Sequence, residues 1–366
     1  MGFAFIKHET HIDFIGKRHI AYAISILLIL AGLGTAVFGG LKMGIDFAGG
    51  VIVQVQFAQP VDDQALKKSM DIPELPGIST QRFGEGGRDY LLRFSATQAD
   101  ADAGALRTNV MQALTAAFPD NPASIQRLEL VGPKVGADLA NKALEALYYA
   151  TLLIAVYISG RFEQRWMAGG VMAAALWGGM YVVGMTGLSM GWLVCISLAI
   201  TLAVCWKLRL NFALGAVVGL LHDVVVTVGL LAMLGREIDL NVVAALLTLV
   251  GYSLNDTIIV YDRIRENIRA TPDLGLKDII NNSVNQTLSR TILTSGTTAA
   301  ATLALYVLGG GVINDFALTM LIGVVIGTCS SIYVSSAILL AMGEDTSIYT
   351  RPQREAYERP GEHGVV

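Results

Sequence analysis

Charged residues lie inside or at the end of long apolar blocks, where a chain rarely places them. The pair His222-Asp223 sits about halfway along one block, and Asp256 lies about one helical turn before the end of the next. Arg290 opens the block that follows. A charged residue within a membrane span costs about 2.5–3.5 kcal/mol on insertion scales, so each of these positions needs a reason.

A proton relay is the chemistry that these residue types favour. A carboxyl group deprived of water takes up a proton more readily, and a neighbouring arginine makes it release the proton again. Movement of Arg290 relative to Asp256 would therefore load and unload a proton and couple a proton gradient to helix motion. His222 and Asp223 are candidates for the same relay, and their greater depth ranks Asp223 ahead of Asp256.

Each of these residues also has a simpler interpretation. His222 and Asp223 would serve equally well as a satisfied hydrogen-bond pair between helices. Arg290 would serve as an ordinary basic residue at the membrane interface, and Asp256 as a polar contact in helix packing. Composition and spacing leave both interpretations open.

The composition is that of a membrane protein with many spans. Of 366 residues, 53% are hydrophobic and 15% charged, against about 25% charged in a soluble domain. The mean hydropathy of +0.55 excludes a soluble enzyme and a disordered chain. A net charge of -4 gives no basic footprint for nucleic acid. The three cysteines lie in apolar blocks without a metal-site spacing, and no nucleotide-binding loop occurs, so we expect no metal, no cofactor and no enzyme activity.

Apolar blocks near the 20 residues that cross a bilayer predict eight transmembrane helices. The blocks occupy about residues 20–38, 143–160, 166–186, 192–206, 212–234, 240–261, 291–309 and 316–342. Lysine and arginine gather in alternate connections, whereas the short connections on the other face carry only Arg236. Because basic residues favour the cytoplasmic side, we expect both termini in the cytoplasm.

The polar residues 41–141 then lie outside the cytoplasm and predict a small α+β domain. Val51, Val53, Val55 and Phe57 alternate with polar residues, as in a strand with one buried face. A helix, two strands, a second helix and a last strand follow, which is the β-α-β-β-α-β order of a ferredoxin-like fold.

The expected organisation therefore has five parts. They are a cytoplasmic N-terminus (1–19), a first transmembrane helix (20–40), the extracytoplasmic domain (41–141), a helix bundle (142–342) and a cytoplasmic tail (343–366).

Several motifs, in order, resemble the SecF family of bacterial protein-export membrane subunits. The resemblance covers about residues 10–345. Its motifs are Gly44-Ile45-Asp46-Phe47-Ala48-Gly49-Gly50, Val131-Gly132-Pro133-Lys134-Val135-Gly136, Leu221-His222-Asp223, Asn255-Asp256-Thr257, Asp262-Arg263-Ile264-Arg265-Glu266-Asn267, Ser289-Arg290-Thr291 and Asp315-Phe316-Ala317.

The resemblance implies a function that spacing alone could not. SecF-like proteins pair with SecD, resemble half of a resistance–nodulation–division transporter and assist export of preproteins at the SecY-E-G channel, using the proton-motive force. The family's intramembrane acid falls on Asp256 and its basic partner on Arg290, which reverses the ranking by depth. The implied partners are a separate SecD-like chain, the SecY-E-G channel, the translocating preprotein and the lipid bilayer, in the bacterial cytoplasmic (inner) membrane.

The chain departs from the family at about residues 163–208. SecF-like chains usually carry six spans, and here an additional apolar hairpin precedes His222-Asp223. Two other hypotheses remain: a proton-coupled small-molecule exporter of the same superfamily, and a structural subunit in which Asp256 and Arg290 form a static pair.

Overall fold

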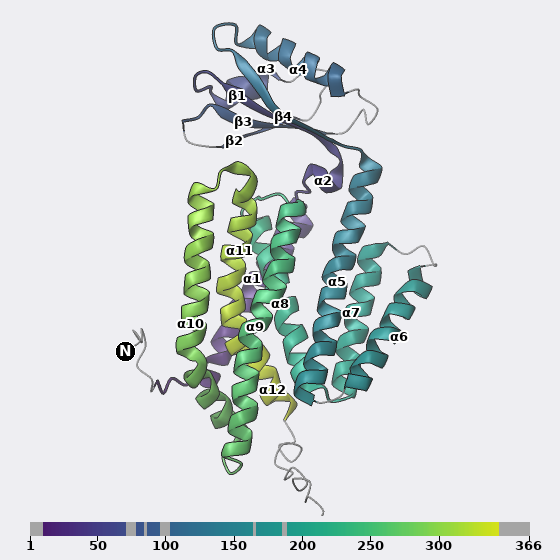
Figure 1. Cartoon of the computed structure of the whole chain (residues 1–366), viewed down its shortest axis with the longest axis vertical. Coiled ribbons are helices and arrows are strands. Elements are labelled where there is room, and N and C mark those ends of the chain that lie inside the picture. The colour runs from purple at the N-terminus through teal and green to yellow at the C-terminus, as the bar shows by residue number, and fades with distance from the viewer. Residues whose placement is uncertain are drawn as a thin grey trace, which may run out of the picture.

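The computed structural model describes residues 10–70, 78–83, 86–95, 103–163, 166–184 and 189–343, which form a helical bundle with a small α/β domain at one end (Figure 1). Parts of the expected N-terminus (residues 1–9) and nearly all of the expected tail (residues 344–366) lie outside the described residues. The first helix begins and the last one ends at the end of the bundle away from the sheet (Figure 1).

The bundle is built from long apolar helices. They are α1 (Arg18–Gly39), preceded by a 3-10 turn (Ile15–Lys17), then α5 (Pro133–Glu163), α6 (Trp166–Gly184), α7 (Met190–Lys207), α8 (Asn211–Met233), α9 (Leu240–Ala270), α10 (Leu276–Leu308), α11 (Gly311–Ser330) and α12 (Ser336–Met342). A π-helical segment (Ser331–Ser335) separates the last two. At 1.5 Å per residue the 31-residue α5 is about 46 Å long, more than the roughly 30 Å apolar core of a bilayer.

Seven helices in the described part of the chain are long and apolar enough to cross a membrane. They correspond to seven of the eight predicted spans. The remaining predicted span, residues 166–186, forms α6, which is helical over Trp166–Gly184 but is not one of the seven. Among the described residues, seven of the eight predicted spans are therefore supported.

The α/β domain contains the predicted elements in the predicted order. These are β1 (Gly50–Phe57), α3 (Asp63–Ser69), β2 (Ser79–Phe83), β3 (Asp89–Ser95), α4 (Ala103–Ala117) and β4 (Ala123–Val131). The four strands form one sheet in the order β2-β3-β1-β4, with every neighbouring pair antiparallel.

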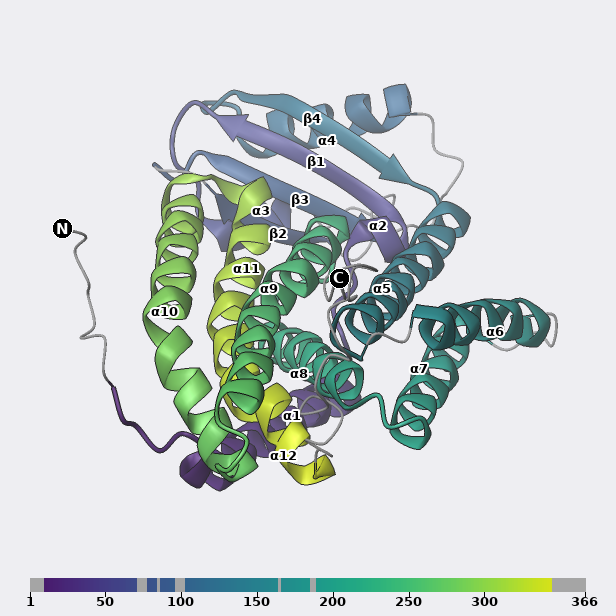
Figure 2. The same ribbon diagram turned by 60° about the horizontal axis from the view of Figure 1, so that its bottom comes forward.

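The core of this domain lies between one face of the sheet and its two helices. The alternating residues Val51, Val53, Val55 and Phe57 are all buried there, as their spacing predicted. Leu66 of α3 and buried residues of α4 complete the same cluster. The other face of the sheet turns towards the bundle (Figure 2).

A short helix that the sequence did not indicate, α2 (Ile45–Ala48), joins the domain to the bundle. The backbone N–H of Gly44 donates to the carbonyl of Ile238, and the N–H of Ile238 donates to the carbonyl of Lys42. A side chain at Gly136 of α5 would lie only 2.7 Å from the carbonyl oxygen of Phe47, so this glycine permits α5 to run against α2. The base of the domain is thus attached to the bundle through the backbone bonds to Ile238 and through the contact between α2 and α5.

The additional hairpin lies at one side of the bundle. Helix α6 packs against α5 and α7, and α7 packs against α5, α6 and α8. Figure 2 shows α6 beyond α5 and α7, far from α10 and α11. The hairpin therefore leaves the contacts among α8, α9, α10 and α11 intact.

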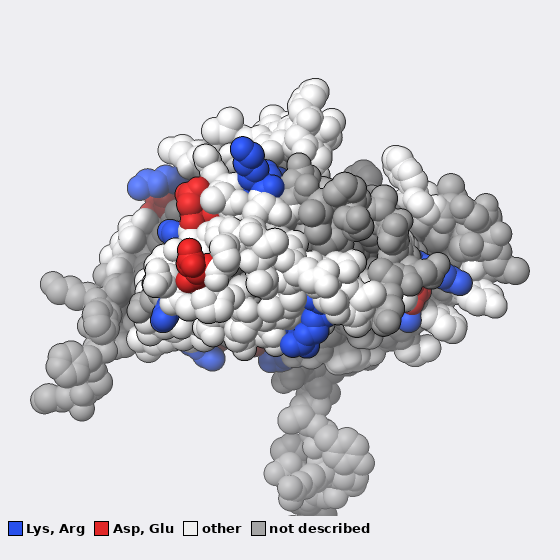
Figure 3. All heavy atoms as spheres, turned by 90° about the horizontal axis from the view of Figure 1, so that it is seen from above, with Lys and Arg blue, Asp and Glu red and all other residues white. Residues whose placement is uncertain are grey.

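Charges on the face of the molecule seen from above are scattered (Figure 3). Basic and acidic side chains stand singly or in small groups among uncharged ones in the part of this face that the structure describes. This mixture of signs agrees with the small net charge of -4.

Candidate functional site

Both acids that the sequence singled out are buried where helices of the bundle meet. Asp223 lies on α8 and Asp256 on α9, and each is 1% exposed. Their hydrogen-bond partners differ.

Asp223 is bonded through both carboxylate oxygens. Its Oδ2 accepts from the hydroxyls of Ser253 on α9, at 2.6 Å, and Ser330 on α11, at 2.8 Å. Its Oδ1 lies 3.0 Å from Nδ1 of His222, whose Nε2 lies 2.9 Å from the hydroxyl of Ser25 on α1. These contacts join four helices, as the simpler interpretation of an interhelical hydrogen-bond pair requires.

Asp256 is bonded through one oxygen only. Its Oδ2 accepts from the hydroxyl of Ser295 on α10 at 3.2 Å, whereas its Oδ1 is buried and has no hydrogen-bond partner. The hydroxyl of Thr328 on α11 lies 2.7 Å from that of Ser295. Asp256 thus stands at the junction of three helices with one oxygen available to a new partner.

Arg290 is exposed on α10, near enough for its charge to act on Asp256 but not in direct contact with it. No ion pair or hydrogen bond joins its guanidinium to this carboxylate, and both residues lie within the described part of the chain. Because α9 and α10 pack together, the guanidinium and the free Oδ1 of Asp256 belong to neighbouring helices. The static pair considered from the sequence is absent from this arrangement.

The two acidic sites share two helices. Ser253, which bonds Asp223, precedes Asp256 by three residues on α9. Thr328 and Ser330, which serve the two different sites, are two residues apart on α11. A displacement of α11 would therefore alter both sites at once.

Close approach of α11 to α9 depends on two glycines of α11. A Cβ at Gly327 would lie 3.1 Å from that of Ser253, and one at Gly323 would lie 2.5 Å from a methyl group of Leu249. These two glycines, spaced as G-x-x-x-G, therefore let the two helices pack closely. The sequence did not predict the π-helical segment that begins at Ser331. Such π-helical turns often occur at functional sites.

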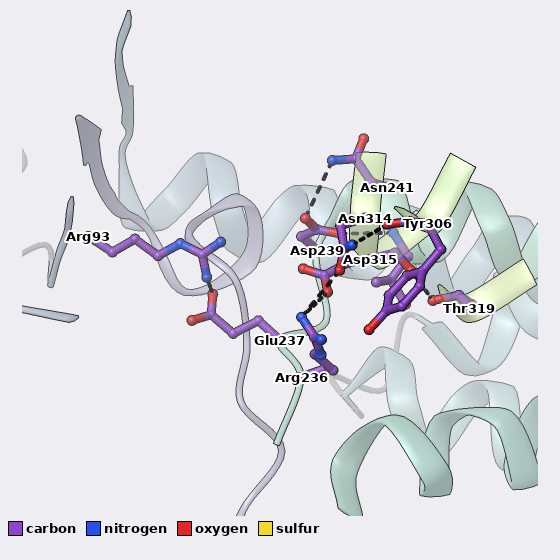
Figure 4. Close-up of polar contacts among 10 residues, drawn as sticks. Arg93, Arg236, Glu237, Asp239, Asn241, Tyr306, Asn314, Asp315 and Thr319 are labelled. Carbon is purple, nitrogen blue, oxygen red and sulfur yellow. Dashed lines mark hydrogen bonds and ion pairs between the residues drawn. The ribbon is translucent and has the colours of Figure 1, made fainter. Parts of the chain in front are cut away.

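A second polar cluster, which sequence reasoning missed, lies between the sheet and the bundle (Figure 4). Arg93 of β3 forms an ion pair with Glu237, and Arg236 forms one with Asp315 of α11 at 3.1 Å. The backbone N–H of Leu240 donates to Asp46 of α2 at 3.0 Å. Asp46 and Asp315 both belong to the family motifs given in the sequence analysis, and this membership is the sequence feature that could have indicated the cluster.

All of these residues except Arg236 line a cavity of about 250 Å³ between the sheet and the bundle. Asp239 on its wall caps α9 by accepting from the N–H of Val242 at 2.8 Å. Burial raises the pKa of Asp239, assisted by the carboxylates of Asp315 and Asp46 and opposed by the Val242 N–H and by Arg93. No group of three or more acidic, histidine or cysteine side chains among the described residues is arranged to hold a metal ion.

Two models of known protein families match this sequence. The family model described as "Protein export membrane protein SecD/SecF, C-terminal" matches residues 110–190 and 186–345. The "SecD/SecF GG Motif" model matches residues 37–61, which include α2.

Similar curated proteins carry the name "Protein translocase subunit SecF". The one from Calditerrivibrio nitroreducens is 37% identical over 91% of this chain and 95% of its own length. The one from Magnetococcus marinus is 42% identical over 92% of this chain and 94% of its own length. The one from Escherichia coli O157:H7 is 34% identical over 95% of this chain and 94% of its own length.

Two solved structures share the fold. The crystal structure of SecDF, a translocon-associated membrane protein from Thermus thermophilus, matches with a TM-score of 0.65 and 29% identity. It covers 92% of this chain, and this chain spans 39% of SecDF. A second structure, SecDF in a "super-membrane-facing form", matches with a TM-score of 0.54, covering 91% of this chain and 39% of that one. The chain therefore belongs to the SecF branch of the SecD/SecF family of protein-export membrane proteins.

Proposed function

We propose that this chain is the SecF-type subunit of a protein translocase and that it uses the proton-motive force, with a SecD partner, to promote export of preproteins. The names of the similar proteins support the subunit assignment. The SecDF structure, of which this chain spans 39%, supports a SecD-like partner on a separate chain. The SecY-E-G channel and the translocating preprotein complete the proposed assembly, and the chain has no catalytic activity of its own.

The observation that carries the proton-coupled role is the environment of Asp256. This carboxylate is buried at the junction of α9, α10 and α11, yet its Oδ1 has no partner. Arg290 on the adjacent helix is exposed and unpaired with it. A shift of α10 against α9 that moved the guanidinium to the free oxygen would favour release of a proton, and the reverse shift would favour uptake.

In this proposal His222 and Asp223 support the relay from a second position. The carboxylate of Asp223 is already bonded on both oxygens, so its role is to hold α1, α8, α9 and α11 in register around the first acid. The ranking that favours Asp256 over Asp223 thus rests on hydrogen-bond geometry as well as on the resemblance.

We place the protein in the bacterial inner membrane. Both chain ends then lie on the cytoplasmic side, and the α/β domain lies outside the cytoplasm. The distribution of lysine and arginine in the connections supports this orientation. The strand order β2-β3-β1-β4 and the βαββαβ succession support a ferredoxin-like class for the domain. The domain boundaries expected from the sequence are retained in this proposal.

Co-purification from native membranes tests the subunit assignment. The full chain is extracted in mild detergent and captured by a tag, and the accompanying chains are identified by mass spectrometry. We expect a SecD-like subunit and components of the SecY-E-G channel. Recovery of the folded chain with neither would contradict the proposal and favour a stand-alone small-molecule exporter.

A further inference from the structure

Three polar groups from three helices form a short chain that ends at the candidate acid. The hydroxyl of Ser295 is 3.2 Å from Oδ2 of Asp256, and the hydroxyl of Thr328 is 2.7 Å from that of Ser295. The Thr328 hydroxyl also lies 2.8 Å from the backbone carbonyl of Val324 on its own helix. Ser295 is 8% exposed, so water has little access to its contact with Asp256, whereas Thr328 is half-buried.

The hydrogen bonds among Asp256, Ser295 and Thr328 can be arranged in two ways, and in each of them every hydroxyl hydrogen has an acceptor. A hydroxyl group carries one hydrogen and accepts through its oxygen. When Asp256 is ionised, Thr328 donates to Ser295 and Ser295 donates to the carboxylate. When Asp256 is protonated, the carboxyl group donates to Ser295, Ser295 donates to Thr328, and Thr328 donates to the carbonyl of Val324. Both arrangements use the same oxygen positions.

We infer that Ser295 and Thr328 are positioning residues that let Asp256 exchange a proton without moving its neighbours. One proton joins or leaves the carboxylate, two hydroxyl hydrogens rotate, and no bond between heavy atoms changes. The Val324 carbonyl is essential to this scheme because it accepts the hydrogen that Thr328 withdraws from Ser295.

Asp223 has no such hydroxyl relay at its Oδ2 oxygen. Its Oδ2 accepts from Ser253 and Ser330 at once, so a proton on that oxygen would displace a donor. The inference deepens the proposed function, because it rests on Asp256 being the group that exchanges protons.

The test is a pH titration of the Asp256 carboxyl group by infrared difference spectroscopy on the full-length chain in lipid nanodiscs. The band of the protonated carboxyl group is assigned by its loss in Asp256→Asn. In Ser295→Ala the ionised carboxylate loses the hydrogen bond that Ser295 donates to its Oδ2. We expect the midpoint of the titration to rise by about one pH unit, equivalent to about 1.4 kcal/mol.

Substitutions at Thr328 separate its hydroxyl group from its size. Thr328→Val removes the hydroxyl at nearly constant volume and weakens the donation from Ser295, so the midpoint rises by less than about half a unit. Thr328→Ser keeps the hydroxyl and restores the wild-type midpoint. Thr302→Val is the matched control, because this buried hydroxyl on α10 donates only to carbonyls of its own helix, and it leaves the midpoint unchanged.

Each outcome decides a different claim. Wild-type midpoints in both Ser295→Ala and Thr328→Val overturn the inference, as does an equal shift in Thr302→Val. If Ser295→Ala does not fold, the contrast between Thr328→Val and Thr328→Ser decides alone. Absence of any titrating band that depends on Asp256 contradicts the proposed function itself.

Discussion

Asp223 and Asp256 are equally buried, at 1% exposure each, but only Asp223 is bonded through both of its carboxylate oxygens. The free Oδ1 of Asp256 marks this residue as the one with an available contact. Burial at the same level thus serves two purposes: Asp223 ties helices together, and Asp256 stays open to a change of partner.

Truncation of Asp223 is expected to weaken the fold more than truncation of Asp256. Asp223→Ala removes the carboxylate that Ser253 and His222 contact and leaves Ser330 with the Gly327 carbonyl alone, which costs about 2 kcal/mol or more in the free energy of unfolding. Asp256→Ala deprives only Ser295, which has Thr328 as another contact. Thermal unfolding of the two purified variants in the same detergent provides the comparison, and equal or reversed losses would contradict the assignment.

The contact between α1 and α8 depends on a pair of glycines. A Cβ at Gly32 would lie 2.6 Å from Cα of Gly229, and backbone atoms cannot give way as side chains do. We expect Gly32→Ala to lower the stability of the chain by about 1–3 kcal/mol because the two helices must separate. Gly34→Ala on the same helix meets nothing within 4 Å and is the control. Equal melting temperatures for the two variants would show that this close approach does not exist.

The cavity beneath the sheet predicts a pH effect at Asp239. Because burial raises the pKa of this carboxyl group above its ordinary value of 3.8, the folded state holds the proton more tightly than the unfolded state. The resulting stabilisation is complete below pH 3.8 and is lost as the pH rises through the higher folded pKa. Asp239→Asn, which keeps an acceptor for the Val242 N–H, should therefore be at least as stable as wild type at pH 7.

Unfolding midpoints of wild type and Asp239→Asn at pH 7 and near pH 4 measure this effect. The stability of wild type relative to that of Asp239→Asn should increase when the pH is lowered from 7 to about 4. A relative loss would mean that the ionised form is the one favoured by the fold. Asp62→Asn, at an exposed cap of α3, controls for effects of removing a charge.

Much of the fold followed from patterns in the sequence. Alternation from Val51 to Phe57 predicted β1 because one face of the sheet is buried. The apolar blocks predicted eight spans, and seven of them are described helices that could cross a membrane. The start of α5 at Pro133 was missed, since its first turns extend past the apolar block. Helix α2 was missed as well, because four residues carry no periodic signal.

The site was predictable in part, for a physical reason. Depth along an apolar block is visible in the sequence, but the partners of a side chain depend on how helices pack. Depth therefore ranked Asp223 first, whereas the hydrogen bonds that distinguish it from Asp256 come from other helices. Ser295 and Thr328 are unremarkable in the sequence and become informative only when α9, α10 and α11 meet.

The most direct test of the central claim compares export driven by the proton gradient in Asp256→Asn and Arg290→Ala with that in wild type. Preprotein export is followed in inverted membrane vesicles, and capture of the SecD-like partner is measured in the same membranes. Asp262→Asn and Arg269→Ala, exposed or half-exposed positions near the end of α9, are the matched controls. The account predicts normal assembly in all four variants, with proton-dependent export lost only in Asp256→Asn and Arg290→Ala. Wild-type proton dependence in those two variants would contradict the account, and lost assembly in them would indicate a purely structural role.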